Sequence, residues 1–252
     1  MKQILRQSIV VISSFALLAC NGSVKNDSTS NNTTSNASKI TQVENQSSSE
    51  LKQNNSNEVK NSHKTKNIEL NRFNELEVNC AAEVVYKSGE SPSISITADD
   101  NTLNNIIADV TDNTLAISLK GNNSYDNLKI EINGPSMIED IDLSGACSFK
   151  NIGRINPRSL DIECLGASKI ALNEISCTEI NIDCLEASSA IINNLECDEL
   201  DIDCFGASNV TISGRCISAE YEANGASTID VTKLNASKIA KEMITDASTI
   251  KK

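Results

Sequence analysis

Carboxylates recur at two fixed positions along the second half of this chain, four and six residues before a repeated alanine. In five successive repeats, nine of these ten positions are acidic, and Asn181 occupies the tenth. The nine residues, called here the acidic ladder, are Asp140, Asp142, Asp161, Glu163, Asp183, Asp201, Asp203, Glu220 and Glu222. Clustered carboxylate oxygens are ligands of hard cations, so weak calcium binding is one chemistry open to them. The alternative is a solvated acidic face that keeps a surface protein soluble and blocks strand pairing with other molecules.

Six of the nine cysteines also form columns in the same alignment. Cys164, Cys184 and Cys204 share one position, and a second position recurs ten residues before an alanine, at Cys177, Cys197 and Cys216. We expect these residues to pack as free thiols, because buried cysteine behaves as a small hydrophobe. Disulfides are the alternative, since neighbouring strands about 4.8 Å apart bring Cα atoms into disulfide range. We expect no firm metal site and no cofactor beyond weakly bound calcium.

A third column is apolar and lies just before the repeated turn. It consists of Leu165, Leu185 and Phe205, called here the apolar stripe. Strict alternation would direct these side chains outward, where they would form a contact patch for a partner. The alternative is that the chain bends at this point and the side chains pack at the corner.

Composition excludes several classes of function. The formal net charge is -12, which argues against nucleic-acid binding through phosphates. The single histidine, His63, lies in a polar run and supports neither a histidine-rich zinc site nor a Ser-His-Asp triad. A polysaccharide-active β-helix enzyme, similar to a lyase, is the alternative to a binding protein. It would need a base beside the acids and aromatic rings for sugars, but from residue 67 onward only three Phe and three Tyr occur.

The repeat itself indicates how these columns are held. The alanines are Ala146, Ala167, Ala187, Ala207, Ala226 and Ala247, between 19 and 21 residues apart. Strict apolar–polar alternation before each alanine predicts strands with one buried face. A unit of about 20 residues cannot bury that face alone, but stacked copies can. We therefore predict an all-β parallel β-helix over residues 67–252.

The two ends of this domain are less regular than its middle. Alternation predicts strands at 76–80, 93–97, 106–110, 115–119 and 128–132, which we expect to form the opening coils and a cap. The alternation between residues 234 and 252 is poor, so a capping coil is expected there.

The N-terminal region has the pattern of an export signal. A basic start, a short apolar run and Leu17-Leu18-Ala19-Cys20 resemble the lipobox of bacterial lipoproteins. The resemblance implies a signal peptide at 1–19 and lipidation of Cys20, so that acyl chains bind the protein to a membrane. Residues 20–66, rich in Asn and Ser, are expected to be a disordered tether. Asn21 favours the outer membrane over the inner one.

Residues 68–252 resemble the GIN domain, a head domain assigned to auto-transporter adhesins. The repeat Ile141-Asp-Leu-Ser-Gly-Ala146 and the opening Phe73-x-x-Leu76-x-Val78 carry the resemblance. It implies a right-handed parallel β-helix and a place in the bacterial cell envelope. The expected protein is therefore a non-enzymatic lipoprotein, an adhesin-like or scaffold module that presents a glycan- or protein-binding surface on a flexible tether.

Overall fold

The structure is a computed structural model that describes residues 63–89, 91–121, 125 and 127–252. The predicted signal peptide, the lipidated Cys20 and nearly all of the predicted tether lie outside these residues. The first strand begins at Lys64, three residues before the predicted start of the domain. In the described part of the chain, no helix is long and apolar enough to cross a membrane.

Strands and one short helix make up the N-terminal part of the domain. They are β1 (Lys64–Glu69), β2 (Glu75–Asn79), β3 (Glu83–Ser88), β4 (Ser93–Ala98), α1 (Asp100–Asn105), β5 (Ile106–Thr111), β6 (Thr114–Leu119) and β7 (Lys129–Gly134). The five strands predicted between residues 76 and 132 correspond to β2, β4, β5, β6 and β7. Asp99 caps α1, because its carboxylate accepts hydrogen bonds from the Thr102 amide and hydroxyl.

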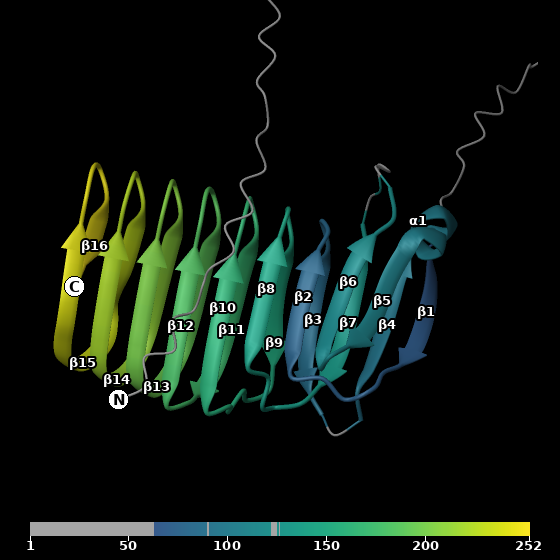
Figure 1. The fold of residues 1–252 in the computed structure, drawn as a ribbon, viewed down its shortest axis with the longest axis horizontal. Helices are drawn as coiled ribbons and strands as arrows, with labels where there is room; N and C mark the ends of the chain where they lie inside the picture. Colours follow the sequence, from purple (N-terminus) through teal and green to yellow (C-terminus); the bar gives the residue numbers. More distant parts are fainter. Residues whose placement is uncertain (1–62, 90, 122–124, 126) are drawn as a thin grey trace, which may run out of the picture. The chain divides into compact units, whose positions relative to one another are not determined.

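The second half is a regular β-solenoid with coils of about 20 residues. Its strands are β8 (Asp140–Ser144), β9 (Ser148–Ile152), β10 (Ser159–Cys164), β11 (Lys169–Ser176), β12 (Glu179–Cys184), β13 (Ser189–Cys204), β14 (Asn209–Ala223), β15 (Thr228–Ile244) and β16 (Thr249–Lys251). Successive coils pair in parallel and in register, and Figure 1 shows them stacked side by side. The predicted all-β parallel solenoid is confirmed.

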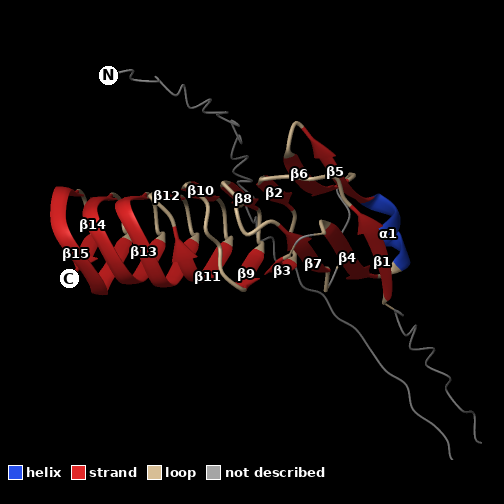
Figure 2. Cartoon of the chain, turned by 90° about the horizontal axis from the view of Figure 1, so that it is seen from below, coloured by secondary structure: helices blue, strands red, loops and turns tan. Residues whose placement is uncertain are grey.

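Each coil places strands on two sides of a narrow core. β8, β10 and β12 stack on one side and β9 and β11 on the other, as Figure 2 shows, while β13 and β14 are long enough to run through both. Alternate side chains such as Leu160, Ile162 and Cys164 point inward and are at most 2% exposed. Each fully buried aliphatic side chain of this kind contributes about 1.5–3 kcal/mol. The period-two pattern therefore supplies both the strands and the core.

The coil order in space differs from the order in sequence at the N-terminal end. β2 pairs with β6 on one side and β8 on the other, and β3 likewise lies between β7 and β9. The first coil of the chain is thus the second in the stack. Antiparallel strands β1, β4 and β5 complete this end, where α1 also lies (Figure 1).

The repeated turn requires a left-handed backbone at one position. Gly166 has φ +70°, and a Cβ built on it would lie 2.8 Å from the Gly145 carbonyl oxygen of the previous coil. Glu186 occupies the same turn position with φ 62° and Asp246 with φ 55°. The turn therefore tolerates a side chain, but only in a conformation that costs L-residues roughly 1–2 kcal/mol.

The C-terminal coil continues the solenoid, as Ile239 and Ile244 follow the inward columns of Ala219 and Ala223. A register shift between Ala219 and Glu220 accommodates the irregular sequence that made a capping coil the expectation. The Ile239 and Ile244 side chains are 42% and 47% exposed.

Candidate functional site

The structure brings the nine predicted carboxylates onto one face of the solenoid. Asp140 pairs with Asp161, which pairs with Asn181, and the same register continues through Asp201 to Glu220. The second column runs in parallel two residues further along each strand. Because neighbouring parallel strands lie about 4.8 Å apart, each carboxylate faces another at that spacing.

The ladder is longer than the repeats alone predicted. Glu75 and Glu77 of β2 pair with Asp140 and Asp142 of β8, which adds one more rung to each column. Ala81 follows Glu77 by four residues and Glu75 by six, which is the spacing of the repeats, but the alignment began at Ala146 and so missed these two acids. Ala81 and the alternation Glu75-Leu76-Glu77-Val78 were the available signals, and the pairing of β2 with β8 assigns them to the ladder.

Several ladder carboxyls are partly withdrawn from water. Burial raises the pKa of Asp142 to about 7, and the charges of Asp140 and Glu163 contribute to the rise. Burial likewise raises the pKa of Asp140, Asp183 and Asp203 to about 6, with like charges from neighbouring rungs adding to it. A fraction of the ladder is therefore protonated near neutral pH, unless a cation reaches it.

Two groups relieve the repulsion within the ladder. The Asn181 amide donates a hydrogen bond of 2.6 Å to the Asp161 carboxylate, which separates the acids above and below it. At the C-terminal end, the Lys241 ammonium lies 3.1 Å from Glu222. A shallow pocket of about 330 Å³ lies beside this end, and Asp201, Glu220 and Lys238 are among its lining residues.

The ladder does not form a ready-made metal centre. Among the described residues, no group of three or more His, Cys, Asp and Glu side chains is arranged to hold a metal ion. The carboxylates run along two lines instead of converging on one point. Weak calcium binding therefore stays a prediction, to be tested in solution.

The apolar stripe lies at the turn that follows the ladder strands. Leu165 and Leu185 are half-buried, and Phe205 is 36% exposed, so none of the three belongs to the fully buried core. Their amides donate to carbonyls of the previous coil, which fixes the turn beneath them. Phe205 therefore fits the outward direction that alternation predicts, whereas Leu165 and Leu185 also pack partly at the corner.

Both cysteine columns form as the sequence predicted. Cys164, Cys184 and Cys204 align in register inside the core and are 0% exposed. All eight cysteines among the described residues are free thiols. Burial, the largest contribution, raises the pKa of Cys177 to about 12, so this thiol is protonated.

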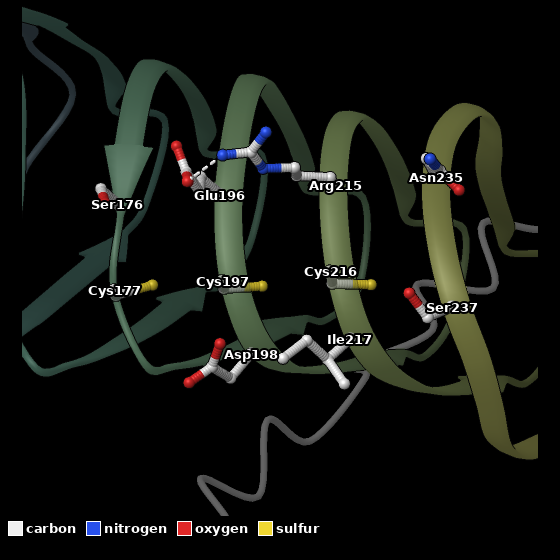
Figure 3. Close-up of a pocket in the computed structure, with 10 residues that line it drawn as sticks. All are labelled: Ser176, Cys177, Glu196, Cys197, Asp198, Arg215, Cys216, Ile217, Asn235 and Ser237. Carbon is white, nitrogen blue, oxygen red and sulfur yellow. Dashed lines mark hydrogen bonds and ion pairs between the residues drawn. The ribbon is translucent and has the colours of Figure 1, made fainter.

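The second cysteine column differs from the first because it lines a surface groove of about 390 Å³. Figure 3 shows the sulfur atoms of Cys177, Cys197 and Cys216 in one line along the solenoid. The ion pair of Arg215 with Glu196 borders one side of this line. Sequence alone placed the column but did not reveal the groove.

The family model described as "Putative auto-transporter adhesin, head GIN domain" matches residues 72–249. The chain belongs to the GIN domain family. The match covers all of the ladder and all of the described cysteines, so these features lie within the family's domain.

Solved structures show that the same fold occurs in other bacterial proteins. A "putative adhesin" from Bacteroides fragilis has a TM-score of 0.63 at 18% identity, covering 75% of this chain and 96% of that one. Another "putative adhesin", from Parabacteroides distasonis, has a TM-score of 0.58 at 16% identity, covering 77% and 98%. No curated protein matches this chain. At these identities the likeness establishes the fold of the GIN domain alone.

Proposed function

We propose that this GIN domain is a non-enzymatic, adhesin-like binding module of the bacterial cell envelope, and that the acidic ladder with the adjoining apolar stripe is its contact surface. The observation that carries the proposal is the extended ladder, in which Glu75 and Glu77 join the nine carboxylates of the repeats. Like charges on directly opposed strand positions destabilise a sheet. A partner that brings positive charge to this face relieves that repulsion, so binding and folding favour the same state.

The apolar stripe adds a second kind of contact to the charged face. Phe205 directly follows Cys204, the last residue of β13, and lies two residues after Asp203 of the ladder. An exposed ring beside a column of carboxylates suits a partner that carries basic and apolar groups together, because aromatic residues supply contact area at low entropic cost. We infer a protein surface or a glycan with cationic substituents as the ligand.

A sugar-cleaving enzyme of lyase type is less well supported by the same residues. Tyr86, Phe149 and Tyr221 are at most 1% exposed and Phe73 is 4% exposed, so they serve the core. Among the described residues, Phe205 and Tyr125 are the aromatic rings that remain for a sugar to stack on. Fold likeness to β-helix enzymes is not evidence of activity.

Binding of the full chain to an array of immobilised glycans and basic and acidic extracellular proteins tests the contact surface. The ladder variant combines Asp183→Asn and Asp203→Asn. A matched control carries Glu131→Gln and Glu174→Gln, two exposed carboxylates off the ladder. We expect the ladder variant to lose binding and the control to keep it. Equal binding by both variants would contradict the proposal.

The envelope location is a separate part of the proposal and rests on the lipobox-like sequence around Cys20. Acyl chains on this thiol would hold the domain at a membrane, with the outer membrane favoured. Cells that express the chain with labelled palmitate should incorporate the label, and Cys20→Ser should remove both the label and the membrane association. Unchanged membrane association of Cys20→Ser would contradict the anchor without affecting the ladder.

A further inference from the structure

The last coil leaves two inward columns of the core open to water. Ile239 follows Ala219 in register, and Ile244 follows Ala223. Both alanines are 0% exposed, because β13 lies on one side of them and β15 on the other. Ile239 and Ile244 have a coil on one side only and are 42% and 47% exposed. Apolar surface that every earlier coil buries therefore stays in contact with water, which is unfavourable.

The same end also presents an unpaired strand edge. β15 pairs with β14 along one edge, whereas on its other edge β16 covers only Thr228, Ile229 and Asp230. Among the described residues, no strand pairs with this far edge between Lys233 and Ile244. The N–H and C=O groups of such an edge are available to a strand of another molecule.

The opposite end of the stack is closed. There α1 lies beside β1 and β4 (Figure 1), and its Thr102 is 2% exposed. Ile94 and Ile96 of the antiparallel strand β4 are at most 1% exposed. A solenoid with one closed and one open end can stack on another copy only through the open ends. Such a contact uses the same surface on both copies, so assembly stops at two.

Charge also favours the open end as the place where two copies meet. Residues 67–227 contain 9 Lys and Arg but 27 Asp and Glu, so most of the domain repels a second copy. Residues 228–252, called here the terminal coil, contain five lysines and three acids. The terminal coil is therefore the part of the stack where a second copy approaches without strong repulsion.

The order of the charges along the open edge is self-complementary. Lys233 and Lys238 come before Ile239 in the chain, and Glu242 and Asp246 come after it. Antiparallel pairing of two such edges sets the basic half of one edge against the acidic half of the other. Parallel stacking would instead place lysine beside lysine.

We propose that the terminal coil is the interface of a homodimer in which two copies of this chain meet end to end about a twofold axis. Each copy covers the Ile239 and Ile244 side chains of the other, and the two β15 edges pair as antiparallel strands. The dimer presents two acidic ladders, so a ligand with repeated sites binds it with higher avidity than it binds a single domain.

Sedimentation velocity over a dilution series tests the dimer. The sample is the chain from residue 20 onward with Cys20→Ser, which keeps every described strand. We expect the mass to double between the lowest and the highest concentration. Ile239→Lys combined with Ile244→Lys should stay monomeric throughout, because like charges then meet across the twofold axis.

The matched control is Ile191→Lys combined with Ile217→Lys. These isoleucines lie on earlier coils and are 46% and 58% exposed, so the added charge and the lost apolar surface are similar. The control should dimerise as the parent does. Circular dichroism of each variant verifies that the strands are intact.

Cross-linking locates the contact between the two copies. Unlabelled and heavy-nitrogen-labelled chains are mixed and treated with a carbodiimide, and mass spectrometry identifies links between a light and a heavy peptide. We expect these mixed links to join lysines and acids of the terminal coil. A parent that stays monomeric would overturn the proposal and show that the lysines protect the edge from pairing. Dimers of the Ile239→Lys, Ile244→Lys variant, or mixed links confined to earlier coils, would overturn it as well.

Discussion

Glu75 of β2 and Asp140 of β8 lie side by side on neighbouring parallel strands, although the chain between them forms β3 to β7 and α1. This contact joins the N-terminal coils to the regular repeats. It also carries the acidic ladder across the junction, so the ladder runs from β2 to β14 without a break in register.

The raised pKa values predict that the protein gains stability on mild acidification. Burial raises the folded-state pKa of Asp142 from 3.8 to about 7, and those of Asp140, Asp183 and Asp203 to about 6. The folded state therefore holds protons more tightly than the unfolded state. This stabilisation is fully present below pH ~4 and is lost as the pH rises towards about 7.

Calorimetry between pH ~4 and ~8 measures this dependence, and we expect the melting temperature to fall as the pH rises. Asp142→Asn should raise the melting temperature near pH 8 and flatten the profile. Hydrogen bonds from Thr102 and Thr232 lower the pKa values of Asp99 and Asp230. These two carboxyls therefore change the stability only at lower pH. A melting temperature that climbs from pH ~5 to ~8 would contradict the electrostatic description of the ladder.

The repeated turn predicts opposite effects of two substitutions. Glu186→Gly should stabilise the fold by about 1 kcal/mol, because relief of the left-handed strain exceeds the added freedom of the unfolded chain. Gly206→Ala should destabilise it by about 2 kcal/mol. At Gly206 a Cβ would lie 2.8 Å from the Glu186 carbonyl oxygen, and φ is +80°. Urea denaturation measures both, and a destabilised Glu186→Gly would show that the glutamate side chain has a structural role.

Calcium at millimolar concentration should raise the melting temperature slightly, if the ladder carboxylates share the cation between rungs. The variant with Asp142→Asn and Asp183→Asn should lose that rise, while Glu131→Gln with Glu174→Gln should keep it. An unchanged melting temperature of the parent chain would contradict calcium binding. The ladder would then be interpreted as a solvated acidic face.

Replacing Leu165, Leu185 and Phe205 together with serine separates the two roles of the apolar stripe. Since the leucines are half-buried and Phe205 is exposed, we expect a loss of about 2 kcal/mol and an intact fold. Binding to the ligand found on the array should be lost with it. Retained binding together with reduced stability would assign the stripe to corner packing.

Local patterns predicted most of the fold, because each repeat carries its own register. The spacing of the alanines aligned Asp161 with Asp140 and Cys184 with Cys164, and the structure has the same pairs. Alternation also gave the inward direction of the first cysteine column, Cys164, Cys184 and Cys204. These relationships are local to one repeat and its neighbour, which is why a single sequence contains them.

Relationships that depend on the path of the chain could not be predicted in this way. The insertion of β2 between β6 and β8 involves partners that lie far along the sequence, and the repeat position of Ala81 does not say which coils flank β2. The same applies to the groove over Cys197, since its walls come from side chains of adjacent coils such as Glu196 and Arg215. The poor alternation after Leu234 made a capping coil the expectation, but it could not give the register shift with which this coil pairs to β14.

Carboxyl labelling of the domain, free and bound to its tightest ligand from the array, tests the central claim most directly. A water-soluble carbodiimide modifies exposed carboxylates, and mass spectrometry locates the labels. We predict that ligand protects Glu163, Asp183 and Asp203, while Glu131 and Glu174 label equally in both states. Protection of Glu131 or Glu174 with an unchanged ladder, or no ligand on the array, would contradict the account of this face as the contact surface.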